Sequence, residues 1–249
     1  MPLVGTRDLT PILDRAPLMP SLDTEQWALP GARILQVLYE IDDSAMLSLL
    51  PRALHPTIPP TVFFVVTHVP ESSVGPFTLA EVRVGCRSAM RPRTFLTRAY
   101  CDNAAAVTEL RNRWGYPVEQ AEATLQRYYD RAHGLVTAGG RDLLDVSLVN
   151  PEPISGSDVQ YLPNVNLARI QRDGAVVPRL IQVDPDFTFR SADRGKPMLT
   201  SFVADAWELP GCEPNYPVSA SYTVADVTMP KLRFIVDPNK GPMEGVEHV

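Results

Sequence analysis

The chain has 249 residues, a formal net charge of −6 and a sequence pI near 5.3. Its hydrophobic share of 45% and charged share of 21% are those of a globular protein, which excludes a disordered or fibrous chain. The acidic balance argues against nucleic acid as a partner, and no window approaches the 18 apolar residues of a membrane span.

Prolines shape the beginning of the chain. Proline occurs 25 times, about twice its usual share, so we expect short elements joined by shaped loops. Pro11, Pro17, Pro20 and Pro30 divide residues 1–30, which predicts an irregular arm that packs across its own or a neighbouring subunit, or frays. This region lacks a basic start followed by an apolar run, so we expect no secretory signal.

Strands and short helices alternate in the first half of the chain. Runs of β-branched and aromatic residues predict the strands, and the run at 61–69 is apolar on both faces at its centre, as in a buried strand. Acidic or amide residues precede each helix, and a proline or glycine follows it. The predicted strands are 32–41, 61–69, 77–86 and 94–100, and the predicted helices are 44–50 and 104–113.

The second half of the chain consists mainly of short strands. Glycine-containing turns at 138–140 and 172–174 predict hairpins. The pattern favours an α+β protein, mostly antiparallel β with a few short helices, whose strands form a cone or barrel around an apolar pocket. We expect one domain over 31–237 and a polar, mobile tail over 238–249. The predicted strands are 123–129, 134–137, 143–149, 166–170, 180–183, 187–189, 199–203 and 219–237.

The common catalytic motifs are absent. The sequence contains no dinucleotide or phosphate loop, no His-Glu-x-x-His and no Gly-x-Ser-x-Gly. The four histidines lack metal-ligand spacing, so we expect neither a metal nor a cofactor. His68 lies on the apolar strand 61–69, where it is either a satisfied structural histidine or a group that binds substrate.

Cysteine and lysine are both sparse. Cys86, Cys101 and Cys212 form an odd count without a Cys-x-x-Cys pair, which predicts reduced thiols in a cytoplasmic protein. Lysine occurs only three times, at 196, 231 and 240, so arginine supplies the other 20 of the 23 basic residues.

Glu81 and Arg83 are two residues apart on the predicted strand 77–86, so their side chains point to the same face. If that face is outside, they form a surface pair of little consequence. If it is inside, they form a charged patch within a cavity, able to orient a carbonyl or carboxylate. The residue pattern leaves both interpretations open.

Four motifs, in order and at matching spacing, resemble the acetoacetate decarboxylase family. A strand end, Tyr-Cys-Asp-Asn at 100–103, is followed by a helix and then by Tyr-Pro at 116–117. Gly-Pro-Phe-Thr at 75–78, the Pro-Asn strand at 162–170 and the closing strand at 219–237 are similar to segments of that family. The resemblance covers about residues 30–237 and implies a β-cone or barrel around a buried pocket, in a homo-oligomer.

The family's chemistry does not follow from these motifs. In the family, the residue after Tyr-Pro is a buried lysine that forms a Schiff base with a β-keto acid, next to a second lysine that lowers its pKa. Here those positions hold Val118 and Glu119. The family's two pocket glutamates fall at Phe64 and Leu79, and its pocket arginine falls at or beside Ala32. The resemblance therefore implies a pocket that has lost its Schiff-base lysine.

The resemblance makes an interior position for the charged pair more plausible, because the pair shares a strand face with a pocket-glutamate position. Glu81 is then the candidate general acid or base, and Arg83 or Tyr116 is the candidate donor that orients a carbonyl. The candidate substrate-binding residues are Ala32, Phe64, His68, Leu79, Trp114 and Val118.

Three functions remain open. The first is an enzyme of secondary metabolism that acts on a hydrophobic, polyketide-like substrate by cyclisation, cycloaddition or dehydration, without Schiff-base chemistry. The second is a protein that binds an apolar small molecule and performs no chemistry. The third is a β-keto acid decarboxylase that uses another residue, such as Lys231. All three predict a small-molecule partner and neither a nucleic-acid nor a membrane partner.

Overall fold

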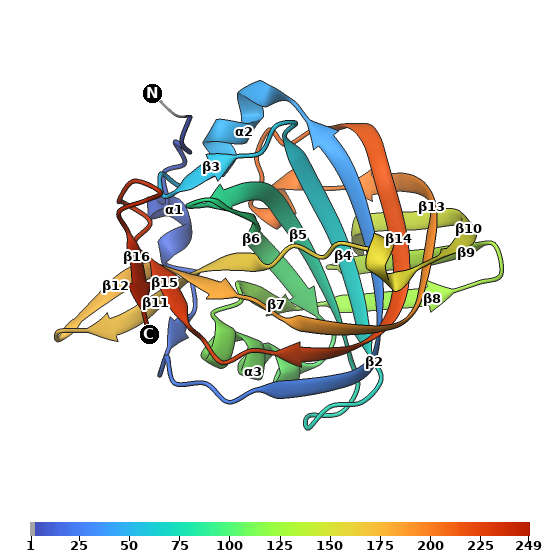
Figure 1. The fold of residues 1–249 in the computed structure, drawn as a ribbon, viewed down its shortest axis with the longest axis horizontal. Helices are drawn as coiled ribbons and strands as arrows, with labels where there is room; N and C mark the ends of the chain where they lie inside the picture. Colours follow the sequence, from blue (N-terminus) through green and yellow to red (C-terminus); the bar gives the residue numbers. More distant parts are fainter. Residues whose placement is uncertain (1–2) are drawn as a thin grey trace.

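One large sheet dominates the computed structural model, which describes residues 3–249 (Figure 1). Its main path runs β16-β15-β12-β11-β6-β5-β4-β2-β14-β13-β10-β9-β8. The strands are β1 (Leu18–Met19), β2 (Trp27–Ile41), β3 (Leu54–Pro56), β4 (Thr61–Val69), β5 (Phe77–Ser88), β6 (Arg91–Cys101), β7 (Val118–Gln120), β8 (Glu122–Arg127), β9 (Arg131–Ala138), β10 (Arg141–Ile154), β11 (Asn164–Arg172), β12 (Ala175–Val183), β13 (Asp186–Phe202), β14 (Pro214–Met229), β15 (Phe234–Val236) and β16 (Val246–His248).

The expected fold class is confirmed. Most neighbouring strands pair antiparallel, and the parallel pairs involve only β6 or β11 with a neighbour. The sheet curls but does not close by hydrogen bonds, since its path ends at β8 and β16. Figure 1 shows β2, β4 and β14 side by side, with the hairpin β11–β12 projecting on the side where both termini lie.

Helices are short within residues 3–249. They are α1 (Thr10–Leu13), α2 (Asp43–Leu49), α3 (Ala104–Trp114) and two 3₁₀ turns, η1 (Gly156–Asp158) and η2 (Ala204–Trp207). The Asn103 side chain caps α3 by accepting from two backbone N–H groups, and Gly115 ends it in the left-handed conformation (φ 62°). None of these helices has the length and apolar character needed to cross a membrane.

Three predicted strands differ from the structure. The segments 187–189 and 199–203 belong to one strand, β13, because most of the residues between them are exposed or half-buried and give no apolar signal. The predicted strand 219–237 is divided instead. Pro230, which has no N–H to donate, follows the last residue of β14, and pairing resumes in β15.

Both ends of the chain pack onto this same subunit. In the arm, β1 pairs in parallel with β11, and the Arg169 N–H donates to the Pro17 carbonyl oxygen at 2.7 Å. The arm ends earlier than expected, because β2 already begins at Trp27. The tail was expected to be mobile, but it carries β16, which pairs antiparallel with β15.

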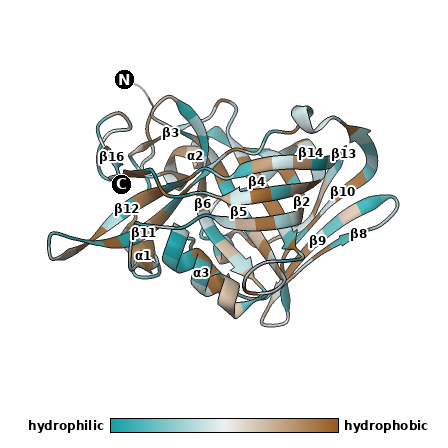
Figure 2. Ribbon diagram, turned by 60° about the horizontal axis from the view of Figure 1, so that its bottom comes forward, coloured by the Kyte–Doolittle hydropathy of each residue, from teal (hydrophilic) through white to brown (hydrophobic). Residues whose placement is uncertain are grey.

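Both faces of the central strands are buried. On β4, the even-numbered residues Val62, Phe64 and Val66 belong to one hydrophobic cluster, whereas Phe63 and Val65 belong to another on the opposite face. Figure 2 shows this concentration of hydrophobic residues on the central strands. We call the two layers the inner core, which contains Phe64, and the outer core, which contains Phe63.

Gly134 allows β9 to pack closely on β4 inside the curled sheet. A Cβ atom at this position would lie 2.7 Å from Cγ2 of Val66 and 3.5 Å from Cδ2 of Leu35. Such a contact is shorter than van der Waals packing permits, so one of the two strands would have to move. The curl of the sheet around the inner core therefore depends on the missing side chain.

We predict that Gly134→Ala lowers the free energy of unfolding by about 1–3 kcal/mol, since it overpacks the inner core. Urea unfolding followed by circular dichroism measures the change. Gly241→Ala is the matched control, because the nearest atom to a Cβ there is Glu244 Oε2 at 3.5 Å. Adding Val66→Ala to Gly134→Ala should recover part of the loss, and equal stability of the Gly134 and Gly241 variants would contradict the prediction.

Candidate functional site

A cavity of about 60 Å³ lies in the outer core, and we call it the head cavity. Its walls come from β2, β4, β5, β14, α3 and the segment that leads into β13. Most of the lining is apolar, and its charged members are Glu81 and Arg83. The lining residues are Leu29, Ile34, Thr67, Val69, Phe77, Leu79, Glu81, Arg83, Leu110, Tyr116, Pro185, Phe187, Val227 and Met229.

Strand β5 holds the charged pair within this cavity. The Glu81 side chain is only 2% exposed and the Arg83 side chain 14%. Arg83 Nε donates to Glu81 Oε1 at 3.2 Å, and Arg83 Nη2 donates to Glu81 Oε2. This paired, two-bond geometry is the arrangement that lets a carboxylate and a guanidinium remain charged away from water.

The pair keeps its guanidinium charged. Burial acts to lower the pKa of Arg83, but the interactions with Glu81, Tyr116 and Tyr161 together outweigh that effect, and the pKa lies above its ordinary value. A guanidinium has five N–H groups, and the two bonds to Glu81 leave three of them for another acceptor. Arg83 can therefore bind a carboxylate or a carbonyl oxygen without giving up its partner.

Tyr116 completes the polar part of the cavity. It follows Gly115, and a Cβ on that glycine would lie 2.7 Å from Cβ of Ala168, so the close turn requires glycine. The Tyr116 hydroxyl donates to Asn164 Oδ1 at 3.5 Å, a long bond that leaves it available to another acceptor. Burial, reinforced by the charge of Glu81, raises the pKa of Tyr116, so the phenol stays protonated at neutral pH.

The structure brings four of the predicted site residues together around the head cavity, namely Leu79, Glu81, Arg83 and Tyr116. Three others, Ala32, Trp114 and Val118, are fully buried in the same outer core but do not line the cavity. Trp114 lies behind the wall. It stacks on Trp27, which in turn stacks on the lining residue Phe77.

The structure corrects the placement of Phe64 and His68. Both are even-numbered residues of β4, which places them on the face opposite the cavity. Phe64 belongs to the inner core and meets the ring of Phe202 edge-on at 5.0 Å. His68 Nδ1 lies 3.1 Å from Thr78 Oγ1, and burial together with the charge of Arg33 lowers the pKa of His68. The β4 residues that line the cavity are Thr67 and Val69.

Sequence reasoning missed several polar groups beside the cavity. Asn164 Nδ2 donates to Asn166 Oδ1 at 2.6 Å, and Asn166 Nδ2 donates to the Trp114 carbonyl oxygen at 2.9 Å. Both amides are buried, and they form a chain behind the Tyr116 hydroxyl. Both asparagines lie in the Pro-Asn segment at 162–170, and this motif was the signal that could have identified them. No comparable signal marked Phe187, which reaches the cavity from the edge of β13.

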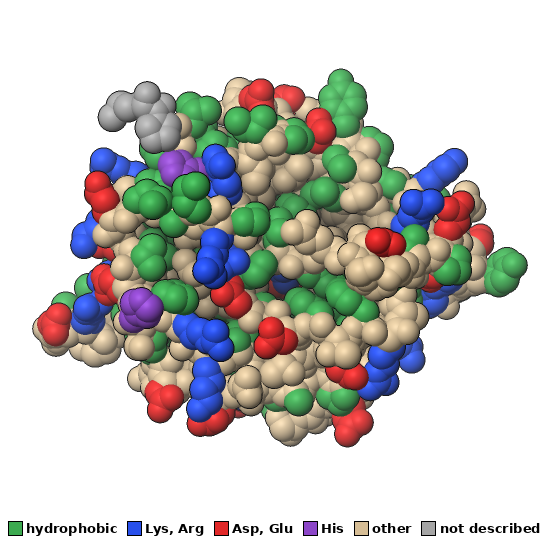
Figure 3. Space-filling view, viewed as in Figure 1, with side chains coloured by type: hydrophobic (Ala, Val, Ile, Leu, Met, Phe, Trp, Pro, Cys, Tyr) green, Lys and Arg blue, Asp and Glu red, His purple; other side chains and the backbone are tan. Residues whose placement is uncertain are grey.

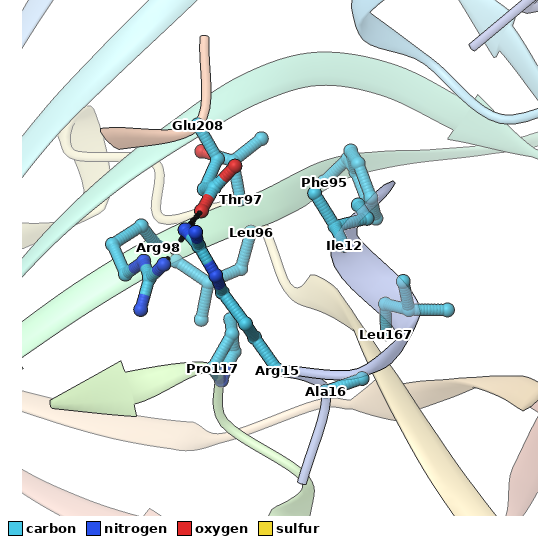
Figure 4. A pocket seen from close by; sticks show the side chains of 10 residues that line it. All are labelled: Ile12, Arg15, Ala16, Phe95, Leu96, Thr97, Arg98, Pro117, Leu167 and Glu208. Atoms are coloured by element: carbon cyan, nitrogen blue, oxygen red, sulfur yellow. Dashed lines mark hydrogen bonds and ion pairs between the residues drawn. The ribbon is translucent and has the colours of Figure 1, made fainter. Parts of the chain in front are cut away.

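Glu119 lies on the other face of β7 from Val118 and belongs to a separate charge cluster. Arg98 donates to Glu119 and, at 2.6 Å, to Glu208 Oε1, which also accepts from Arg15 at 2.6 Å. Figure 4 shows the two arginines converging on Glu208 beside a cavity of about 20 Å³. These ion pairs tie the N-terminal arm to β6 and η2, away from the head cavity.

The three lysines lie at the surface. Lys196 and Lys240 are exposed, and Lys231 Nζ lies 3.3 Å from Glu25 Oε1 in an exposed ion pair. Among the described residues, 3–249, no lysine lines the head cavity. The cationic group inside the cavity is the guanidinium of Arg83.

Comparison with known proteins gives one consistent family. The family model for acetoacetate decarboxylase matches residues 15–238, whereas no curated protein matches the chain. Among solved structures, an acetoacetate decarboxylase is 20% identical with a TM-score of 0.76, covering 88% of this chain and 92% of that one. An acetoacetate decarboxylase from Legionella pneumophila is 19% identical with a TM-score of 0.69, covering 84% and 86%.

A third similar structure is the enduracididine biosynthesis enzyme MppR, bound to the condensation product of pyruvate and imidazole 4-carboxaldehyde. It is 17% identical to this chain with a TM-score of 0.68, and the match covers 84% of this chain and 89% of that one. An acetoacetate decarboxylase-like enzyme from Sphingomonas wittichii RW1 is 16% identical with the same TM-score of 0.68, covering 85% and 94%. At such identities these matches establish the fold.

We predict strong coupling between the two buried charges. Arg83→Met should lower the free energy of unfolding by about 3–5 kcal/mol, because it leaves the Glu81 carboxylate buried without its partner. The double variant Glu81→Leu/Arg83→Met should be more stable than Arg83→Met alone, since no unpaired charge remains. Urea unfolding of the wild type, both single variants and the double variant measures the coupling, and additive losses would contradict it.

Proposed function

The chain belongs to the acetoacetate decarboxylase family, and from that premise we propose that it is an enzyme that moves a proton next to a carbonyl group without forming a Schiff base. The observation that carries the proposal is the content of the head cavity. A carboxylate, a guanidinium and a phenol face an apolar space of about 60 Å³, and no lysine among the described residues lines that space.

The cavity offers each group that such a reaction needs. Glu81 is the base that removes a proton from the carbon beside the carbonyl, and the electron pair of the broken C–H bond moves onto the carbonyl oxygen. The Tyr116 hydroxyl donates a hydrogen bond to that oxygen as its charge grows. The remaining N–H groups of Arg83 bind a neighbouring carboxylate or second carbonyl, and Glu81 later returns the proton to the product.

The apolar walls support a hydrophobic, polyketide-like substrate of secondary metabolism. Cyclisation and dehydration of such compounds both begin with loss of a proton beside a carbonyl, so they use Glu81 and Tyr116. Cycloaddition requires the substrate to be confined but needs no acid or base, so it would not use Glu81 and Arg83. The geometry therefore favours cyclisation and dehydration. The similarity in fold to MppR, a biosynthesis enzyme by its description, agrees with this assignment.

The second candidate is a protein that binds a small molecule without changing it. One observation favours it: both oxygens of Glu81 already accept hydrogen bonds from Arg83, which weakens the carboxylate as a base. The third candidate, a β-keto acid decarboxylase that uses Lys231, requires an exposed, paired amine to act as nucleophile. We further propose that the protein is cytoplasmic and forms a homo-oligomer. Size-exclusion chromatography with light scattering tests the oligomeric state.

We predict that the protein exchanges the methyl hydrogens of pyruvate with deuterium in D₂O, and that Glu81→Gln slows this exchange at least 100-fold. Pyruvate has a carboxylate for Arg83 and a carbonyl for Tyr116, and its six non-hydrogen atoms suit a cavity of this size. Proton NMR follows the exchange. Glu122→Gln, an exposed glutamate on β8, is the matched control and should retain the wild-type rate.

The same assay separates the candidates. Binding of pyruvate without exchange supports the binding protein and overturns the catalytic role of Glu81, as does full exchange by Glu81→Gln. A folded Glu81→Gln variant, checked by circular dichroism, is required for the comparison.

We also predict that sodium borohydride traps no adduct when the protein is incubated with acetoacetate, because no lysine among residues 3–249 lines the head cavity. Intact-mass spectrometry reads the result, and a lysine-dependent acetoacetate decarboxylase serves as the positive control. A mass increase that disappears in Lys231→Arg would establish the third candidate instead.

A further inference from the structure

A second space lies beside the head cavity, and we call it the outer groove. It has a volume of about 420 Å³ and runs between β2, β14 and the segment around η1. Phe63 and Leu38 form part of its apolar lining, and Gln36, Ser219 and Ser221 form part of its polar lining. Figure 3 shows hydrophobic and uncharged side chains over the surface around η1, interrupted by an acidic side chain.

The outer groove and the head cavity approach each other at two points. On adjacent strands, Phe63 of the groove is the register partner of Arg83 of the cavity. On the opposite wall, Tyr161 stands between Gln160 and Leu162, which both line the groove, while its ring packs on the cavity residue Phe187 at 5.0 Å. One layer of side chains therefore separates the two spaces.

Tyr161 is held in that layer by identified contacts. Its hydroxyl lies 2.7 Å from Thr223 Oγ1, and its ring also packs on Phe189 at 5.7 Å. Thr223 is fully buried on β14, and Ser221, two residues earlier on the same strand, lines the groove. Tyr161 therefore belongs to the wall between the groove and the cavity.

The two volumes differ in what they can hold. At roughly 10–15 Å³ for each water-sized group, the head cavity accommodates about four to six such groups, which is the head of a molecule and no more. The outer groove is about seven times larger, and its lining mixes apolar side chains with amides, hydroxyls and two charged groups, Asp158 and Arg194. That mixture suits a hydrocarbon chain that carries oxygen atoms at intervals.

We propose that the outer groove binds the chain of a substrate whose carbonyl head lies in the head cavity, and that Tyr161 and Phe187 form the partition across which the substrate extends. The inference deepens the proposed function and rests on it for the position of the head. It makes Tyr161 and the lining of the groove determinants of substrate length, separate from the groups that move the proton.

Isothermal titration calorimetry with a series of 2-oxo acids tests the proposal. We expect 2-oxooctanoate to bind at least tenfold more tightly than pyruvate, because its added methylene groups leave water for the groove. Ser219→Trp, which places a large ring across the groove, should reduce this advantage to less than threefold. Thr124→Trp is the matched control, an exposed strand position on β8 outside the groove, and should retain the full advantage.

The outcomes distinguish this proposal from the proposed function. Equal affinity for the two acids contradicts the proposal that the groove binds the substrate chain. Tighter binding of 2-oxooctanoate that Ser219→Trp leaves unchanged contradicts it as well. Tighter binding of 2-oxooctanoate without deuterium exchange supports the groove and overturns the catalysis. Absence of binding by both acids overturns the two together. Tyr161→Phe provides a second readout, since loss of the bond to Thr223 should speed association of 2-oxooctanoate more than that of pyruvate.

Discussion

The structure of the site depends on one buried ion pair. A carboxylate or a guanidinium alone in an apolar cavity would cost several kcal/mol, so neither Glu81 nor Arg83 can occupy the head cavity without the other. Their two-residue spacing on a strand brings both heads to the same face, and the bonds between them satisfy both carboxylate oxygens. The pair thereby introduces two charges into a core that would otherwise be closed by apolar side chains.

A local irregularity in β6 accompanies this placement. The register between β5 and β6 shifts between Val82 and Arg83, so Thr97 has no partner across the ladder, and its hydroxyl instead donates to the Val82 carbonyl oxygen at 3.1 Å. The extra residue is a β-bulge, which turns the side chains that follow it to the opposite face. Leu96 consequently packs in the outer core, whereas Arg98 points towards Glu208 and the arm. The bulge thus directs Arg83 and Arg98, which lie on adjacent strands, to opposite faces of the sheet.

The sequence predicted the positions of strands and helices better than it predicted which face of each strand meets the cavity. Runs of β-formers located β4 with its observed bounds, and the caps at Asn103 and Gly115 located α3. Because both faces of β4 are buried, apolar alternation could not indicate which face met the cavity, and one residue of misplacement put Phe64 on the wrong side. The same ambiguity left Glu81 and Arg83 open between surface and interior. Tyr161 and Phe187 were beyond prediction, because contacts between distant segments bring them to the site.

In the proposed function the two spaces have separate tasks: the head cavity carries the chemistry and the outer groove selects the substrate. The groups proposed to hold or move a proton face the small cavity, where apolar walls strengthen electrostatic interactions and exclude water. Burial raises the pKa of Tyr161 to about 12, so its hydroxyl keeps its proton and its bond to Thr223 over the working range of pH. Tyr161 therefore acts through its position and not through its charge. On this proposal, a change of substrate length can arise in the wall while Glu81 and Arg83 stay unaltered, because within residues 3–249 no hydrogen bond joins Tyr161 to the ion pair.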